Sequence, residues 1–193
     1  ADRVALVRDG RVVQVGTPQE LFRRPASLFA ARFVRAENVL AFGTPGTGKT
    51  HLLCALGQEL VRNGRTVLFA PTFQIVQRLL AAKRDLRLPS ELKKLDRFDA
   101  LLLDDIGYVQ QSREEMEVLF TLLAERYERR SVLITSNLVF SRWDQIFKDP
   151  MTTAAAIDRL VHHSVIVELN VPSYRLENAK DAIANTRKFF DSI

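Results

Sequence analysis

Eight consecutive residues have the types and spacing needed to hold a chain of phosphates. They are Gly43, Thr44, Pro45, Gly46, Thr47, Gly48, Lys49 and Thr50, and they fit the P-loop pattern G-x-x-x-x-G-K-[ST]. Glycines at these positions let successive backbone N–H groups turn inward around phosphate oxygens. Lys49 would then bridge the β- and γ-phosphates, and the Thr50 hydroxyl would ligate Mg²⁺. The pattern predicts a phosphate-binding loop.

Two adjacent carboxylates form the second group that could do chemistry. An apolar run, residues 100–103, leads directly into Asp104 and Asp105, as in a Walker B strand. A buried parallel strand delivers its carboxyl end to the crevice where phosphates bind. We therefore predict that Asp104 holds Mg²⁺ and that Asp105 polarises the attacking water. Since neighbouring side chains of a strand point to opposite faces, both aspartates can serve only if the strand ends there.

A third polar residue, Asn137, follows another apolar run at residues 132–134. If this run is the strand beside the one that carries the aspartates, Asn137 could orient the water or sense the γ-phosphate. An asparagine at the end of a strand is also a common turn residue, so the sequence leaves both interpretations open.

These groups need a parallel sheet to bring them together, and the sequence predicts one. The P-loop lies between an apolar run at 38–42 and a helical pattern from 51 to 61. Strand-like and helix-like stretches then alternate, with further strands expected at 66–70, 98–103, 132–137 and 165–167. This alternation indicates an α/β fold in which a five-stranded parallel sheet has helices on both faces.

The composition limits the class of protein. The 193 residues, 47% hydrophobic and 26% charged, fit one domain with a small appendage. No apolar run reaches membrane-spanning length and no signal peptide opens the chain, so we expect a cytoplasmic protein without a membrane partner. Cys54 is the only cysteine, which excludes an internal disulfide. The net charge of +5 comes largely from residues 1–37, which hold seven arginines and four acids, so it argues weakly for nucleic acid.

A basic stretch between residues 78 and 97 has two interpretations. It holds Arg78, Lys83, Arg84, Arg87, Lys93, Lys94 and Arg97, interspersed with three acidic residues. It could be a solvated helical face, which is the more common case, or a surface that contacts the phosphate backbone of nucleic acid. No aromatic residue lies in its centre, so the sequence does not indicate base stacking.

The first 36 residues differ in character from the rest. Asp9-Gly10 between two apolar runs predicts a β-hairpin, and Thr17 with Glu20 predicts a capping box that starts a short helix from Pro18 to Arg24. The segment resembles the C-terminal part of an ABC-transporter ATP-binding domain. No ABC catalytic motif is present, so the resemblance carries over no ABC activity.

From about residue 37 onward the chain resembles the IstB-type transposase-helper ATPases, relatives of the DnaC helicase loaders within the AAA+ class. The P-loop and the strand that ends in two aspartates carry this resemblance, together with the stretches 126–131, 134–137, 158–164 and 173–176. It implies an AAA+ core that binds ATP and Mg²⁺ and assembles as a homo-oligomer on DNA beside a transposase. It also implies that Lys49 and Thr50 are the P-loop pair, Asp104 and Asp105 the Walker B pair, and Asn137 sensor one.

Four arginines have roles that only the resemblance suggests. Arg159 resembles the arginine finger that one subunit offers to the γ-phosphate bound by its neighbour, and Arg175 resembles the sensor-two arginine. Arg129 and Arg130 are rivals for the finger. Asp105 stands where many AAA+ ATPases have glutamate, and its shorter reach predicts slower hydrolysis.

We divide the chain into an ABC-like segment, 1–36, and an AAA+ domain, 37–193, that looks fused to it. The sequence predicts an ATP-hydrolysing helper of DNA transposition, whose activity the replaced N-terminal region could impair. Two alternatives stay open: a DNA-binding or helicase-loader-like module that ATP switches with little hydrolysis, and an inactive fusion fragment. A functional ABC subunit is a distant fourth hypothesis, because its other motifs are missing.

Overall fold

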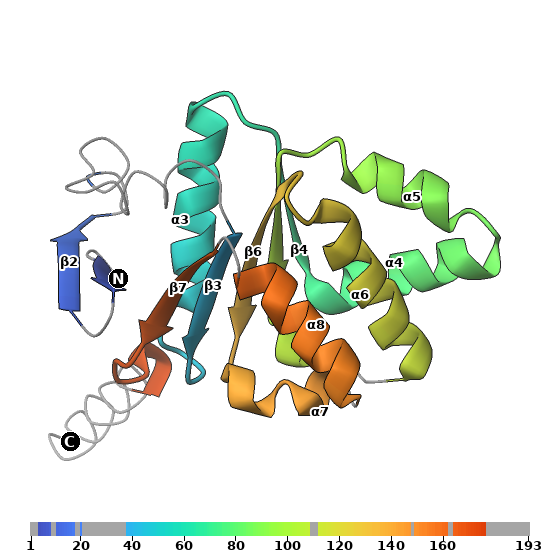
Figure 1. The fold of residues 1–193 in the computed structure, drawn as a ribbon. Helices are drawn as coiled ribbons and strands as arrows, with labels where there is room; N and C mark the ends of the chain where they lie inside the picture. Colours follow the sequence, from blue (N-terminus) through green and yellow to red (C-terminus); the bar gives the residue numbers. More distant parts are fainter. Residues whose placement is uncertain are drawn as a thin grey trace, which may run out of the picture.

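The computed structural model describes residues 4–8, 11–17, 20, 38–108, 112–147, 149–161 and 164–176 (Figure 1). Its strands are β1 Val4–Arg8, β2 Arg11–Gly16, β3 Asn38–Gly43, β4 Val67–Pro71, β5 Ala100–Asp104, β6 Ser131–Ser136 and β7 Ser164–Leu169. Its α-helices are α3 Lys49–Arg62, α4 Thr72–Arg84, α5 Leu88–Leu95, α6 Arg113–Arg126, α7 Asp144–Phe147 and α8 Pro150–Val161. Two short 3₁₀ helices, η1 Ile106–Tyr108 and η2 Phe140–Arg142, complete the described elements.

Five parallel strands form the central sheet, in the order β4-β5-β6-β3-β7. The fold is therefore the α/β P-loop architecture that the alternation of strands and helices predicted. Strand β3 lies between β6 and β7, and the loop at 43–50 follows its carboxyl end. Because the strands are parallel, the carboxyl ends of β5 and β6 lie at the same edge of the sheet as this loop. This is the topological reason why residues about 30 positions apart can form one site.

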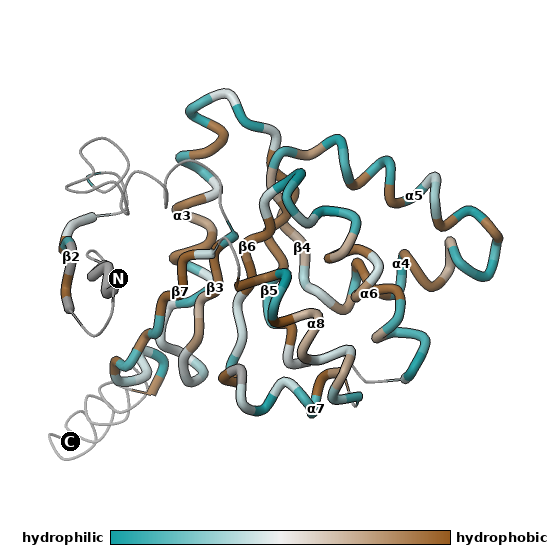
Figure 2. Tube along the Cα trace, in the orientation of Figure 1, coloured by the Kyte–Doolittle hydropathy of each residue, from teal (hydrophilic) through white to brown (hydrophobic). Residues whose placement is uncertain are grey.

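Helices cover both faces of the sheet, and each face has its own core. Along β3, Val39 and Ala41 point toward α3, whereas Leu40 and Phe42 point toward the layer that contains α4, α6 and α8. All four side chains are buried because a parallel strand between two helical layers has no solvent face. Figure 2 shows the result as strands that are brown over most of their length between helices with teal outer turns.

The N-terminal hairpin forms a separate two-stranded sheet, with β1 antiparallel to β2 and Arg8 opposite Arg11. The predicted capping box is present, since the Thr17 N–H donates to Glu20 Oε2 at 2.8 Å and the Glu20 N–H donates to Thr17 Oγ1 at 3.1 Å. The turn at 9–10, most of the predicted helix at 18–24 and all residues after 176 lie outside the described residues.

One helix lies within the basic stretch between residues 78 and 97, for which a solvated helical face was one of the two interpretations. The charged stretch conceals α5, an eight-residue helix with a proline in its first turn. Its apolar side, Leu88, Leu92 and Leu95, packs against the core beside α4, while its other side carries the charges. Among the described residues, no helix combines the length and the apolar character that a membrane span requires.

Candidate functional site

The P-loop wraps around the end of Lys49, the first residue of α3. Lys49 is 8% exposed, and its Nζ donates to the carbonyl oxygens of Gly43 and Thr44, both at 2.8 Å. Gly48 precedes α3 without a side-chain cap, and the first turn of the helix holds no acidic residue. The first N–H groups of the helix are therefore available to an anion, which the positive end of the helix dipole also attracts.

A segment from the far end of the described chain lies on top of this loop. The Tyr174 N–H donates to the Gly46 carbonyl at 3.2 Å. A Cβ on Gly46 would lie 2.0 Å from Ser173 Oγ, and the φ of Gly46 is +87°, so only glycine fits there. The next residue, Arg175, is exposed, and its charge lies close enough to Lys49 to lower the pKa of that lysine. The structure thus brings Arg175 to the P-loop.

Threonine hydroxyls hold the first carboxylate of the acidic pair. Thr50 Oγ1 donates to Asp104 Oδ1 at 2.9 Å, and Thr135 Oγ1, from β6, donates to the same oxygen at 2.7 Å. A third threonine, Thr72 at the start of α4, donates from Oγ1 to the Asp104 main-chain oxygen at 3.0 Å. The predicted pair of Mg²⁺ ligands, Thr50 and Asp104, is therefore in direct contact.

The second carboxylate of the pair, Asp105, lies just after the end of strand β5 and does not have strand backbone geometry. Strand β5 ends at Asp104, and Asp105 has φ +54°, in the left-handed region that residues other than glycine rarely adopt. Its N–H donates to Thr135 Oγ1 at 2.7 Å. This break in the alternation is the condition under which two adjacent aspartates can face one site. Both charges act on Lys49, where they oppose the lowering of its pKa.

Asn137 lies beside Asp105. A Cβ on Gly107 would be 2.5 Å from Asn137 Oδ1 and 3.5 Å from Asp105 Oδ1, so these two oxygens are within about 6 Å of each other. Both are buried, and neither has a hydrogen-bond partner in the described structure. Buried acceptors without a partner in the protein need a donor, and a water molecule or a ligand would supply it.

Burial dominates the electrostatics of the site. It lowers the pKa of Lys49, against the attraction of Asp105 and Asp104. It raises the pKa of Asp105, helped by the negative charge of Asp104 and opposed by Lys49. The site therefore holds a partly desolvated ammonium group next to a carboxylate that is a stronger base than usual.

Arg159, the predicted arginine finger, lies away from the P-loop and the acidic pair of its own chain. Its guanidinium stacks 4.7 Å from the centre of the Phe120 ring of α6, and its Nη1 is buried without a hydrogen-bond partner. The neighbouring Leu160 carbonyl accepts a bond from the Asn38 side chain at the start of β3, whereas the P-loop follows the other end of that strand. Six residues of strand separate the two ends by roughly 16 Å. Arg159 is therefore at the edge of the sheet opposite its own P-loop.

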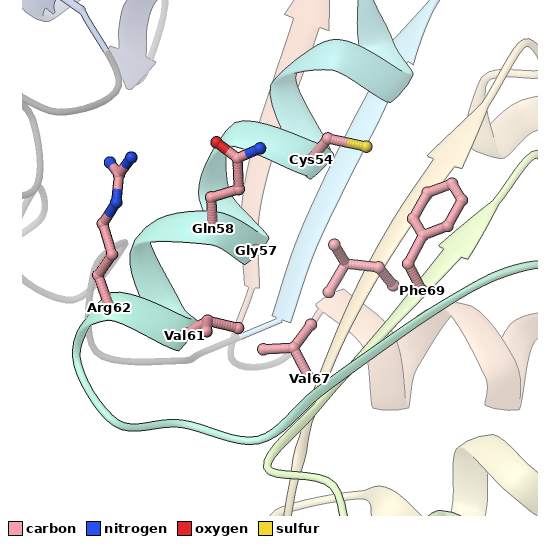
Figure 3. A pocket seen from close by; sticks show the side chains of 8 residues that line it. Cys54, Gly57, Gln58, Val61, Arg62, Val67 and Phe69 are labelled. Carbon is pink, nitrogen blue, oxygen red and sulfur yellow. The ribbon is translucent and has the colours of Figure 1, made fainter.

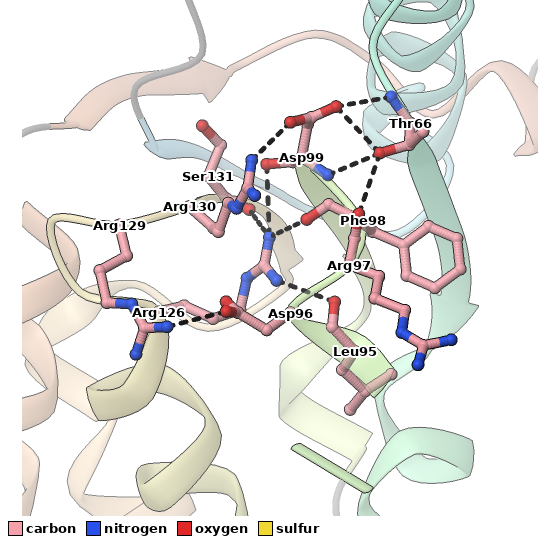
Figure 4. Close-up of polar contacts among 10 residues, drawn as sticks. All are labelled: Thr66, Leu95, Asp96, Arg97, Phe98, Asp99, Arg126, Arg129, Arg130 and Ser131. Atoms are coloured by element: carbon pink, nitrogen blue, oxygen red, sulfur yellow. Dashed lines mark hydrogen bonds and ion pairs between the residues drawn. The ribbon is translucent and has the colours of Figure 1, made fainter. Parts of the chain in front are cut away.

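The rival arginines are tied into a polar network at that same opposite edge (Figure 4). Arg129 forms an ion pair with Asp96 at 2.8 Å, and Arg130 forms one with Asp99 at 2.6 Å. Between them Arg126, which is 2% exposed, donates to four main-chain oxygens, those of Leu95, Phe98, Asp99 and Ser131. These bonds join the loop before β5 to the start of β6.

Ion pairs also account for much of the basic stretch. Four of its seven cations pair with carboxylates: Arg78 and Lys94 with Glu91, Lys83 with Glu117 and Arg87 with Asp85. The described structure records no such partner for the other three, Arg84, Lys93 and Arg97. More than half of these cations are thus engaged within the fold, which favours the interpretation as a solvated helical face, although three carboxylates do not balance seven cations.

An apolar groove of about 440 Å³ lies beside α3, toward the edge strand β4 (Figure 3). Cys54, Gly57, Val61 and Phe69 are among its lining residues, and Phe69 remains 43% exposed. Burial, together with the nearby charge of Asp104, raises the pKa of the Cys54 thiol. None of the predicted site residues lines the groove.

The residues that sequence reasoning missed are Thr72, Thr135 and Ser173, which contact the P-loop or the acidic pair. For Thr135 a signal existed, because a hydroxyl residue stood near the end of a buried strand next to Asn137. Thr72 follows no pattern that a single sequence displays, and Ser173 entered only as the first residue of a stretch, 173–176, that carries the family resemblance. Within the described part of the chain, no three His, Cys, Asp or Glu side chains converge in a way that could hold a metal ion.

Comparison with protein families and with curated proteins gives consistent matches. The model of a family described as IstB-like ATP binding protein matches residues 14–182. An insertion-sequence ATP-binding protein of Sinorhizobium fredii is 51% identical over 148 residues, which are 77% of this chain and 50% of that protein. An ATP-binding protein of insertion sequence IS21 from Pseudomonas aeruginosa is 41% identical over 169 residues, 88% of this chain and 63% of that protein. The chain spans less than two thirds of the length of these relatives.

Solved structures share the fold at low identity. DnaI superposes with a TM-score of 0.64 at 23% identity, over 86% of this chain and 88% of that one. DnaA from Aquifex aeolicus, with AMPPCP bound, gives a TM-score of 0.61 at 19% identity, over 87% of this chain and 49% of that one. The family match begins at residue 14 and so extends into the segment that resembled an ABC domain; the comparisons give that resemblance no support.

Proposed function

The chain belongs to the family of IstB-like ATP-binding proteins, and from this membership we propose that it binds ATP with Mg²⁺ and hydrolyses it to assist DNA transposition. One observation supports the enzymatic part most strongly. Side chains from three separate segments converge at one edge of the sheet: Lys49 and Thr50 from the P-loop, Asp104 and Asp105 from the end of β5, and Asn137 after β6. Such convergence has no structural purpose that apolar residues would not serve better.

Binding depends on the loop at 43–50 and the start of α3. The Lys49 ammonium, which now donates to two carbonyl oxygens, would give up part of this coordination for the β- and γ-phosphate oxygens. The N–H groups of the loop and of the first turn of α3 would surround the same phosphates. Arg175, which the contact between Tyr174 and Gly46 holds over the loop, would add a second cation in the sensor-two role.

The oxygen ligands fit a hard cation. The Thr50 hydroxyl and the Asp104 carboxylate, which are in contact, would hold Mg²⁺, and phosphate and water oxygens would complete its coordination. When bound, the ion would neutralise charge on the β- and γ-phosphates. The absence of a three-residue chelating cluster among the described residues suits a metal that arrives with the nucleotide.

Asp105 and Asn137 would act on the attacking water. Their two unpartnered oxygens lie within about 6 Å of each other, so one water molecule could donate a proton to each. The raised pKa of Asp105 makes this carboxylate a better proton acceptor than an exposed aspartate. Both side chains would thus hold the nucleophile for in-line attack on the γ-phosphate.

We propose that the site is completed by a neighbouring subunit. Arg159 lies at the edge of the sheet opposite its own P-loop, so it would serve the nucleotide of another copy as a trans arginine. Arg129 and Arg130 are weaker rivals because both are engaged in ion pairs. Assembly of such an oligomer on DNA, beside a transposase and in the cytoplasm, completes the proposal. The names of the relatives, which are insertion-sequence proteins, support the role in transposition. We also propose that the chain is divided into a segment, 1–36, and a domain, 37–193.

The test compares nucleotide binding with turnover. Lys49→Ala should weaken binding of a fluorescent ATP analogue in Mg²⁺ by about 30-fold or more, because it removes charge-assisted bonds to phosphate. Lys93→Ala, which removes an exposed lysine of α5, is the matched control and should bind as the wild type does. Asp105→Asn should bind normally and lose about 100-fold or more in turnover. Equal turnover per subunit across a wide dilution series, with and without DNA, would contradict the trans arginine.

A second candidate function has one observation in its favour. Arg159 is stacked on Phe120 and away from the P-loop of its own subunit, so a single copy lacks the trans arginine, and this suits a module that ATP switches between DNA-binding states with little hydrolysis. Nucleotide-dependent DNA binding by the wild type that persists in Asp105→Asn, without measurable turnover in either protein, would favour this function over the first.

A further inference from the structure

Thr135 is the only described residue that contacts both members of the acidic pair through one atom. It lies in β6, the strand next to β5, and is 1% exposed. Its Oγ1 is 2.7 Å from the Asp105 nitrogen and 2.7 Å from Asp104 Oδ1. Since an N–H can only donate, the hydroxyl oxygen accepts there. Its single proton is therefore free to point at the carboxylate.

The two bonds do different things. The bond from the Asp105 N–H holds a residue whose φ is +54°, a conformation that costs about 1–2 kcal/mol outside glycine. The bond to Asp104 adds a second hydroxyl donor to the oxygen that Thr50 already contacts. One side chain thus fixes the backbone of the second aspartate and the carboxylate of the first.

Thr135 also connects this pair to the next polar residue along its own strand. Ser136 ends β6 and Asn137 follows, so the register that places Thr135 against Asp105 also determines where Asn137 lies beside Gly107. A change of this hydroxyl would shift the aspartates relative to Asn137, and within the P-loop it would reach only the Thr50 hydroxyl, which bonds to the same Asp104 oxygen. Lys49 has its own bonds to the loop carbonyls and would keep its place.

We propose that Thr135 is a positioning residue whose hydroxyl orients Asp104 and Asp105 together, so that hydrolysis and Mg²⁺ use depend on it while nucleotide binding does not. This inference rests on the proposed ATPase function. It adds to that function a residue that neither touches the nucleotide nor belongs to the loop or to the acidic pair.

The decisive variants are Thr135→Val, which keeps the β-branched shape and removes the hydroxyl, and Thr135→Ser, which keeps the hydroxyl. Thr153→Val is the matched control, because Thr153 is also buried and donates to a main-chain oxygen, that of Asp149, at 2.8 Å in α8. It reports the cost of losing a buried threonine hydroxyl away from the site.

We expect Thr135→Val to lower kcat by about 10- to 100-fold, the scale of a small misplacement of reacting groups. The Kd for the fluorescent ATP analogue should stay within about threefold of the wild type. The Mg²⁺ concentration needed for half-maximal turnover should rise several-fold. Thr135→Ser should restore both values to within about threefold. Thr153→Val should lose stability only.

A readout that needs no turnover separates this inference from the ATPase proposal. The Asp105 amide proton, followed by NMR, should exchange slowly with solvent in the wild type and in Thr135→Ser, and quickly in Thr135→Val. A wild type that exchanges as expected but never hydrolyses ATP would refute the ATPase proposal and leave the positioning role in place. The positioning role of Thr135 would be wrong if Thr135→Val used Mg²⁺ normally and kept a protected Asp105 amide. It would also be wrong if Thr135→Val and Thr135→Ser lost turnover equally.

Discussion

Replacement of Arg126 by methionine should lower the free energy of unfolding by about 3–5 kcal/mol. Arg126 ends α6 with its guanidinium inside the protein, where it donates to the main-chain oxygens of Leu95, Phe98, Asp99 and Ser131 at 3.0–3.3 Å (Figure 4). Methionine has a similar length and no donor, so the change leaves these buried and partly buried oxygens without that donor.

The magnitude follows from two opposing terms. Each hydrogen bond from a charged donor contributes about 1.5–3 kcal/mol, and the three contacts of Nη2 share two protons, so three full bonds give a gross loss of roughly 5–9 kcal/mol. Removing a buried charge recovers several kcal/mol of desolvation, which brings the net loss to about 3–5 kcal/mol. Burial lowers the pKa of Arg126 to about 10, so the guanidinium remains charged at neutral pH and the bonds are present throughout the assay.

The assay is urea unfolding at pH 7, followed by circular dichroism, with Arg129→Met as the control. Arg129 is about half exposed and pairs with Asp96 and Glu125, so its loss should cost about 0.5–1 kcal/mol. If Arg126→Met lies within about 1 kcal/mol of this control, the inference that Arg126 joins the loop before β5 to β6 is wrong. A change in the m-value would show a different unfolded state and require a second measurement by heat.

Two further predictions concern the loop and the charged helix α5. Gly46→Ala should cost about 1 kcal/mol more than Gly48→Ala in thermal unfolding without nucleotide, since both have a positive φ but only the first meets Ser173; adding Ser173→Gly should remove the difference. Hydrogen bonding by Lys94 lowers the pKa of Glu91. The stability that ionised Glu91 contributes to the fold is therefore present above the unfolded pKa of about 4.3 and is lost as the pH falls through the lowered pKa of the folded state. Glu91→Gln should cost about 1 kcal/mol at pH 7 and progressively less as the pH falls below about 4; a constant cost across this range would contradict the prediction.

The sequence was informative where function depends on residues close together in the chain. A run of eight residues was enough to identify the P-loop, because its glycines and its Lys-Thr pair serve one turn of backbone. The apolar run before Asp104 indicated a buried strand, and the alternation of strands and helices indicated the parallel sheet. The bounds of helix α5 were not predicted, because its three leucines are scattered among charges in a short segment.

The basic stretch shows why a list of charges predicts poorly. Arg78 and Glu91 are 13 positions apart, and Lys83 and Glu117 are 34 apart, yet each pair is in contact. Which carboxylate neutralises which cation depends on how α4, α5 and α6 pack together. No pattern within one helix contains that information.

What the sequence determined by itself is the P-loop pattern, the apolar runs that lead into polar residues and the type of sheet that these runs form. What the tertiary structure decided is how these groups are held: the left-handed turn at Asp105, the shared hydroxyl of Thr135, and the place of Arg159 against Phe120. The physical reason is the separation along the chain over which each kind of interaction acts. Periodicity and turn chemistry act over a few residues, whereas these contacts join strands and helices about 30 or more positions apart, and only the register and packing of the folded chain select them.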